Sequence, residues 1–167
     1  AELALEAGIP EGVFNVITGE GEITGKALAM HMDVDVIAFT GSGEVGRKIL
    51  EYSSLSNLKR VYLELGGKSP NIVFADTPNI DAAVTQSLGG IFRNSGQVCV
   101  AGSRLIIEES IADEFTEKLI NQSKDLVVGD PLNLNSNFGA VSSNEQLMKN
   151  QKYINSAIDD GAKLRIG

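Results

Sequence analysis

Residues 36–46 read VIAFTGSGEVG and carry the pattern that decides the fold class. An apolar stretch of strand length runs into three closely spaced glycines, Gly41, Gly43 and Gly46, and then into a stretch of helical character. Between a strand and a helix, backbone N–H groups and the positive end of the helix can hold a phosphate. The stretch therefore predicts a parallel βαβ unit of the nucleotide-binding kind.

Strand-like and helix-like segments alternate on both sides of this turn, which predicts an α/β chain. In the first part we expect, in order, a helix end at 3–7, a strand at 13–17, a helix at 23–30, a strand at 34–39, a helix to about 52 and a strand at 60–65. In the second part we expect a strand at 71–75, a helix from Pro78 to about 92, a strand at 104–108, a helix opened by Ser110 and Asp113 as a capping box, a helix at 146–158 and a strand at 163–166. The double glycine at 66–67 is the candidate boundary between two domains, 1–66 and 67–167.

Composition narrows the classes of function. The chain has 14 basic and 22 acidic residues and a net charge of −8, which argues against nucleic acid and anionic membrane surfaces as partners. Its apolar runs are far shorter than the roughly 20 residues of a membrane span. A single cysteine excludes an intrachain disulfide, and no metal site is expected. The start at Ala1, without an initiating Met, leads us to expect that the natural N-terminus lies upstream.

The glycine turn matches the dinucleotide pattern G-x-G-x-x-G, which expects an acidic residue about 20 positions further on to bind a ribose. Glu64 has that position. Arg47 and Lys48 follow the last glycine where a Walker motif needs Lys and then Ser or Thr, so ATP hydrolysis is disfavoured. Taken alone, the turn fits a ligand-free structural turn equally well.

Cys99 stands in the stretch GQVCVAG at 96–102, where small residues leave room for a substrate. A thiol attacks only as a thiolate, and this requires amide dipoles or a base to lower its pKa. The single histidine, His31, lies in the nucleotide half and offers no conventional dyad. Taken alone, a lone cysteine is more often a small buried hydrophobic residue than a nucleophile.

Three segments together resemble the aldehyde dehydrogenase superfamily: FTGSGEVG at 39–46, LELGGKSPN at 63–71 and GQVCVAGSR at 96–104. Their order and spacing agree with that family over essentially the whole chain, and the last two are similar to its glutamate and cysteine signatures. The resemblance implies part of a Rossmann-like NAD(P)-binding domain in 1–66, followed by part of the α/β catalytic domain of the aldehyde dehydrogenase fold in 67–167.

The resemblance also implies a mechanism. Cys99 would be the nucleophile that attacks an aldehyde, with the resulting oxyanion held by amide donors such as its own N–H. After hydride transfer, water deprotonated by Glu64 would hydrolyse the thioester, so the family makes Glu64 a general base where spacing alone suggests a ribose ligand. Members that pass the acyl group to coenzyme A lack this glutamate, so Glu64 implies a hydrolytic enzyme.

For the cofactor, the resemblance implies NAD or NADP in the glycine turn. Gly41 and Gly46, with Gly43 between them, would shape the turn, Ser42 would contact the pyrophosphate and Val45 would pack near the adenine. The residues that distinguish NAD from NADP lie upstream of this region in the family.

The implied partners are a small-molecule aldehyde and further copies of a full-length parent that forms a dimer or tetramer, in a cytoplasmic location. The segments at 59–75 and 108–115 resemble those of bacterial dehydrogenases of aminoaldehydes such as γ-glutamyl-γ-aminobutyraldehyde. Complete members also carry an asparagine and a lysine upstream and a Glu-x-Phe segment downstream, all absent from residues 1–167. We therefore expect the isolated chain to be inactive and prone to aggregation.

Two other functions stay open. One is a Cys-dependent acyltransferase or thioesterase, which Cys99 supports and the glycine turn does not. The other is a non-catalytic module in which the turn holds a dinucleotide and Cys99 only packs. Neither accounts for all three segments.

Overall fold

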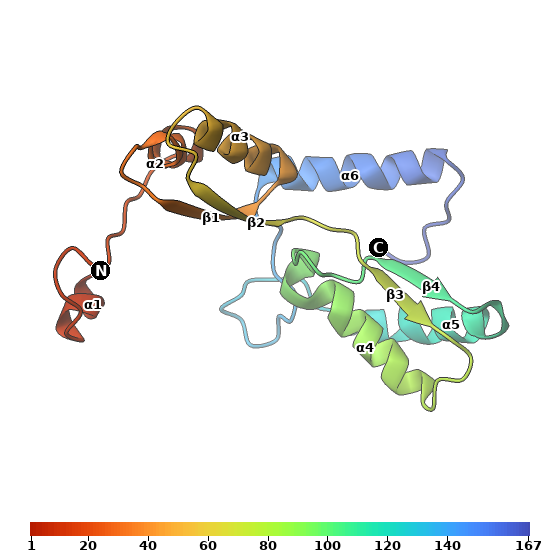
Figure 1. Cartoon of the computed structure of the whole chain (residues 1–167). Helices are drawn as coiled ribbons and strands as arrows, with labels where there is room; N and C mark the ends of the chain where they lie inside the picture. Colours follow the sequence, from red (N-terminus) through yellow and green to blue (C-terminus); the bar gives the residue numbers. More distant parts are fainter. The chain divides into compact units, whose positions relative to one another are not determined.

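The computed structural model describes all 167 residues, which form two compact units, Ala1–Leu65 and Gly66–Gly167 (Figure 1). The division falls at the double glycine. The α/β class predicted from the sequence is confirmed, because each unit contains parallel strands joined through a helix. The assignment of the first unit to cofactor binding and of the second to catalysis stays a prediction.

The first unit is built on a two-stranded parallel sheet of β1 (Val36–Gly41) and β2 (Arg60–Leu65). The connecting helix α3 (Gly43–Ser54) packs on one face of this sheet (Figure 1). Residues of β2 alternate between half-buried and exposed, so that Leu63 and Leu65 face α3 and Glu64 does not. The predicted βαβ arrangement around the glycine turn is confirmed.

The segment before β1 was predicted only in part. The helix end is found as α1 (Glu2–Glu6), stopped by Gly8 with a φ of +89°, and the expected helix is found as a π-helical turn, Gly21–Gly25, followed by α2 (Lys26–Met30). The predicted strand at 13–17 is wrong. Its apolar residues are exposed, since no neighbouring strand in this chain pairs with their backbone groups.

A buried lysine fastens α2 to the rest of the first unit. Lys59 is only 5% exposed, and its Nζ donates to the Ala29 carbonyl oxygen (2.6 Å) and to the Ser56 hydroxyl (2.9 Å). Asn57 donates to two carbonyls of the loop between α2 and β1. The last carbonyls of a helix have no partner within the helix, so Lys59 also acts as a C-terminal cap for α2.

The second unit repeats the arrangement with β3 (Pro70–Val73) and β4 (Arg104–Ile107), again parallel. Helices α4 (Ile80–Phe92) and α5 (Ala112–Ser123) pack on each other, and the buried core consists of Val73, Val84 and Phe115. Ile111 and Leu119 pack against that core.

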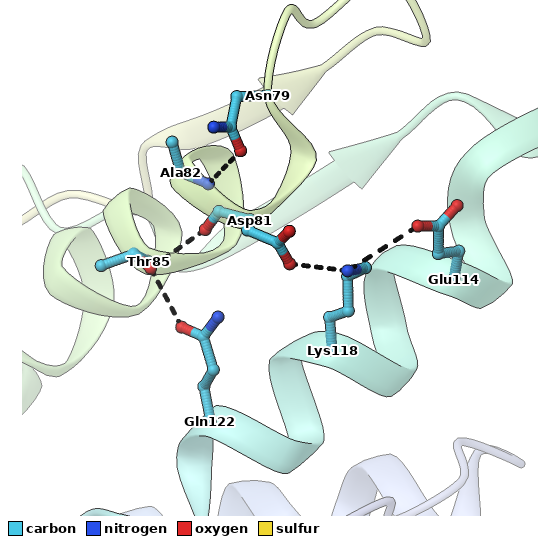
Figure 2. Close-up of polar contacts among 7 residues, drawn as sticks. All are labelled: Asn79, Asp81, Ala82, Thr85, Glu114, Lys118 and Gln122. Atoms are coloured by element: carbon cyan, nitrogen blue, oxygen red, sulfur yellow. Dashed lines mark hydrogen bonds and ion pairs between the residues drawn. The ribbon is translucent and has the colours of Figure 1, made fainter.

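Polar pairs join α4 and α5 at the edge of this core (Figure 2). Lys118 Nζ lies 2.6 Å from Asp81 Oδ1 and 3.9 Å from Glu114 Oε1, and Thr85 Oγ1 donates to Gln122 Oε1. The hydrogen bond with Asp81 raises the pKa of Lys118 above its ordinary value of 10.5. A raised lysine pKa contributes stability that is fully present below pH 10.5 and is lost as the pH rises through the folded-state pKa.

Two predicted helix starts are wrong in detail. Helix α4 begins at Ile80, with Asn79 as its N-cap accepting from the Ala82 N–H (3.0 Å). The predicted capping box at α5 does not form, because the Ser110 hydroxyl donates to Glu108 and a short 3₁₀ turn precedes the helix. A nearby carboxylate competes with the helix end for this hydroxyl.

The C-terminal part contains α6 (Asn144–Asp159), which has Ser143 as its N-cap and confirms the predicted helix. The strand predicted at 163–166 is wrong, since those residues have no strand partner in this chain. No helix has the length and apolar character needed to cross a membrane.

Substitution of Lys59 by Met should lower the stability of the folded protein by about 1–3 kcal/mol, because it leaves the buried Ala29 carbonyl without its closest donor. Thermal unfolding of the variant measures the change. The matched control is Lys163→Met, at an exposed position, which should leave the melting temperature unchanged. Equal melting temperatures for the two variants would refute the anchoring role of Lys59.

Candidate functional site

The glycine turn forms as predicted at the carboxyl end of β1. Gly41 is the last strand residue, Gly43 opens α3, and Ser42 between them is the N-cap, its Oγ accepting from the Val45 N–H (3.2 Å). A side chain at Gly41 would meet the ring of Phe39. The N–H groups of Gly43 and Glu44, the first two of the helix, have no partner in the chain and remain free to bind an anion.

Gly46 has a packing role in this turn. A Cβ at this position would lie 2.9 Å from Cδ2 of Leu65, so the absence of a side chain lets α3 lie directly on β2. The five residues predicted to bind the cofactor, Gly41, Ser42, Gly43, Val45 and Gly46, therefore gather at one corner of the first unit.

An apolar cavity of about 650 Å³ lies beside the turn, between α2, β1 and α3. Its volume falls in the range of ligand-binding sites, roughly 300–1,000 Å³. Val45 lines it together with residues that the sequence analysis did not single out: Gly21, Glu22, Gly25, Lys26, Leu28, Ile37, Ala38, Phe39, Lys48, Ile49 and Tyr52. A sequence pattern could have identified two of these residues, because Ile49 and Tyr52 follow Val45 at the spacing that places all three on one face of a helix.

Glu64 lies near the carboxyl end of β2, opposite Thr40 of β1, and is exposed on the sheet face that α3 does not cover. Its carboxylate has no hydrogen bond or ion pair in this chain. The alternation of the strand causes this placement, because Leu63 and Leu65 on either side of it face the helix. The carboxylate is free to bind a ribose or to accept a proton from water.

Cys99 lies in the second unit, in a turn closed by a hydrogen bond from the Ala101 N–H to the Val98 carbonyl (3.1 Å). Its thiol is exposed, which argues against the reading of Cys99 as a packing residue. Its own N–H has no partner in the chain and can donate to a ligand. A free amide donor beside an exposed thiol is an arrangement that can stabilise the oxyanion formed on the carbonyl oxygen when that sulfur adds to a carbonyl carbon.

The backbone of the Cys99 turn is held closely from two directions. The Gly102 N–H donates to the Gly90 carbonyl of α4 (3.1 Å). A Cβ at Gly67 would lie 2.9 Å from the carbonyl oxygen of Cys99, whereas a Cβ at Gly66 would meet nothing within 4 Å. The second glycine of the pair is therefore the one that admits the turn.

The fold and the comparison with known proteins together identify the family of this chain. The parallel βαβ unit with its glycine turn defines an α/β nucleotide-binding architecture. The model of the Aldehyde dehydrogenase family matches residues 1–167, and the chain belongs to that family.

Relatives and solved structures agree with the family. The chain is 47% identical to Aldehyde dehydrogenase family 2 member C4 of Arabidopsis thaliana, over 100% of the chain and 33% of that protein. It is 48% identical to the structure of an indole-3-acetaldehyde dehydrogenase in complex with NAD+, with a TM-score of 0.96 over 99% of the chain and 34% of the other. It is 51% identical to the structure of a γ-glutamyl-γ-aminobutyraldehyde dehydrogenase from Burkholderia cenocepacia, with a TM-score of 0.91 over 95% of the chain and 32% of the other. The chain thus spans about a third of the length of the relatives it matches.

Proposed function

We propose that this chain supplies the cofactor turn, the nucleophile and the general base of an NAD(P)-dependent aldehyde dehydrogenase that oxidises an aldehyde to a carboxylic acid. The observation that carries the proposal is the exposed Cys99 thiol beside its own unpartnered N–H, in a turn packed against Gly67. Membership of the aldehyde dehydrogenase family supports the reaction class.

The cofactor of the proposal is NAD or NADP, which accepts a hydride when bound. Its pyrophosphate would lie at the free N–H groups that open α3, with the Ser42 hydroxyl as a further donor. Its adenine would enter the cavity that Val45 lines. The NAD+ complex of the indole-3-acetaldehyde dehydrogenase, 48% identical, supports this class of cofactor.

In the proposed reaction the Cys99 thiolate adds to the carbonyl carbon of the aldehyde, and the C=O π electrons move to oxygen. The free Cys99 N–H donates to the oxyanion of this thiohemiacetal. Bound NAD or NADP would supply the two-electron oxidation of the aldehyde carbon by accepting a hydride, which would leave a thioester on Cys99.

Glu64 is proposed to complete the cycle as general base. Its unpaired carboxylate accepts a proton from water as the water oxygen attacks the thioester carbon. The C–S bond breaks, and Cys99 leaves as a thiolate ready for another aldehyde. The alternative role for Glu64, binding of the cofactor ribose, has the same strand-end position and is tested below.

The proposed substrate class is an aminoaldehyde, supported by the γ-glutamyl-γ-aminobutyraldehyde dehydrogenase at 51% identity. We further propose that the active form is a dimer or tetramer of a full-length chain, of which this segment is about a third by comparison with its relatives.

Substitution in the full-length protein separates the two roles of Glu64. Cys99→Ala should abolish turnover, because no other thiol is present in this segment to take its place. Glu64→Gln should keep the cofactor KM and the first burst of reduced cofactor but slow steady-state turnover by about 10²–10⁴-fold, the usual contribution of a general base. Stopped-flow absorbance of the reduced cofactor measures both phases.

The opposite pattern would contradict the assignment. If Glu64→Gln raises the cofactor KM and leaves thioester hydrolysis intact, Glu64 is a ribose ligand. If Cys99→Ala retains full turnover, the nucleophile lies elsewhere and the proposed function of this segment fails.

The neighbouring glycines 66 and 67 offer a matched pair of substitutions. Gly67→Ala should lower kcat by about 10-fold, because its Cβ pushes the Cys99 carbonyl outward by less than the shift of about 1 Å that costs about 10²-fold. Gly66→Ala adds the same methyl group to open space and should leave kcat unchanged. Steady-state kinetics of both variants are the measurement, and equal kcat values would refute the contact.

The isolated segment should be inactive and prone to aggregation. The apolar side chains at 13–17 are exposed, and the outer edges of both two-stranded sheets are unpaired. Both features favour association between chains. Expression of residues 1–167 alone, followed by light scattering and an assay for aldehyde-dependent cofactor reduction, tests both points. Turnover by a monodisperse segment would overturn the prediction.

A further inference from the structure

Residues 138–142, here called the strap, contact the segment that leads into the Cys99 turn at three places. The ring of Phe138 lies edge-on to that of Phe92, with centroids 6.0 Å apart and an interplanar angle of 69°. The Ser95 hydroxyl donates to the Gly139 carbonyl (3.1 Å). The Ser142 N–H donates to the side-chain Oε1 of Gln97 (3.0 Å). All three partners of the strap lie between the end of α4 and Cys99.

The segment under the strap has an unusual backbone. Asn94, Ser95 and Gly96 follow one another with φ values of 51°, 57° and 72°. Non-glycine residues rarely adopt this left-handed region and persist there only where their surroundings hold them. The bond from Ser95 to Gly139 and the ring contact at Phe92 are such surroundings. The strap thus stabilises the sharp path that the chain takes from α4 to Cys99.

Gln97 connects this path to the strap most directly. Its N–H donates to the Asn94 carbonyl (3.0 Å), and its own carbonyl accepts from Asn94 Nδ2 (3.2 Å). With the Ser142 bond, its backbone and its side chain are both fixed, two residues before the nucleophile.

The strap is itself anchored independently of Cys99. At its start, the Phe138 N–H donates to Val127 and the Phe138 carbonyl accepts from Gly129 (3.0 Å). At its end, it leads directly into Ser143, the N-cap of α6. Because its start is fixed by these two bonds, the strap can hold the segment before Cys99 in place.

We propose that the strap is the positioning element for the Cys99 turn, and that Gln97 is the positioning residue through which it acts. The inference rests on the proposed function, since it assumes that Cys99 is the nucleophile. Gln97 contacts neither substrate nor cofactor in this scheme. It acts by fixing the position of the sulfur relative to the aldehyde carbon. Loss of this effect should therefore lower kcat and the burst rate.

The test removes the Ser142–Gln97 bond from each side in the full-length protein. Gln97→Leu deletes the acceptor, and Ser142→Pro deletes the donor, since proline has no N–H. Ser142→Ala keeps the N–H and is the matched control. We expect Gln97→Leu and Ser142→Pro each to lower the burst rate and kcat by about 10-fold to 100-fold with an unchanged cofactor KM, and Ser142→Ala to match the parent.

The double variant gives the decisive result. If both changes act through one bond, Gln97→Leu with Ser142→Pro should be no slower than the slower single variant. A double variant whose fold-loss in kcat equals the product of the two single losses would overturn the proposal. A Ser142→Pro variant with the kcat of Ser142→Ala would also overturn it. Should Gln97→Leu fail to fold, which thermal unfolding would show, Gln97→Met takes its place in the double variant. Methionine also lacks the amide oxygen that accepts from Ser142, so the same non-additivity is expected.

Cys99→Ala measured in parallel distinguishes the two failures. If that variant stays active, the proposed function is wrong. If it is inactive while the strap variants keep the parental kcat, the proposed function stands and only the strap proposal fails.

Discussion

The close approach of α3 to β2 at Gly46 is the contact on which the first unit depends. Only a residue without a side chain fits there, because a Cβ would lie 2.9 Å from Leu65. This contact sets the helix on the face formed by Leu63 and Leu65, so strand alternation leaves Glu64 on the opposite face. It also fixes the helix start, where Ser42 caps the first turn and the cavity lined by Val45 opens. One steric constraint therefore places both the cofactor turn and the carboxylate.

The second unit uses glycines in the same way around its turn. Gly67 admits the carbonyl of Cys99, and Gly102 lies where a Cβ would be 3.1 Å from the Cβ of Asn71. In both units a backbone turn that carries residues of the proposed site packs directly against a neighbouring strand or loop. Side chains at these positions would push the turn outward. The glycines are therefore required for steric reasons and not only for their flexibility.

The sequence predicts those elements whose partners lie within the same 167 residues. The strands at 34–39 and 60–65 were found because they pair with each other, whereas the apolar stretch at 13–17 and the stretch at 163–166 have no partner strand here. Local spacing identified the glycine turn, whereas Cys99 was singled out only by the resemblance of its segment to the family, because a lone cysteine is more often a small buried residue. The cavity and the strap could not be predicted, because their contacts join residues far apart in sequence, such as Ser142 and Gln97, and no short motif encodes them.

The placement of Cys99 reconciles two opposing demands that its proposed role as a nucleophile would make. The sulfur must be reachable, so it cannot be fixed by burial, yet a loosely held sulfur would seldom meet the aldehyde carbon at the required distance. Here the side chain is exposed, and the backbone around it is fixed instead, by the bond from Gly102 to α4, by the contact with Gly67 and by Gln97. Rigidity of the backbone thus replaces burial of the side chain, which leaves the thiol and its N–H open to the same small ligand.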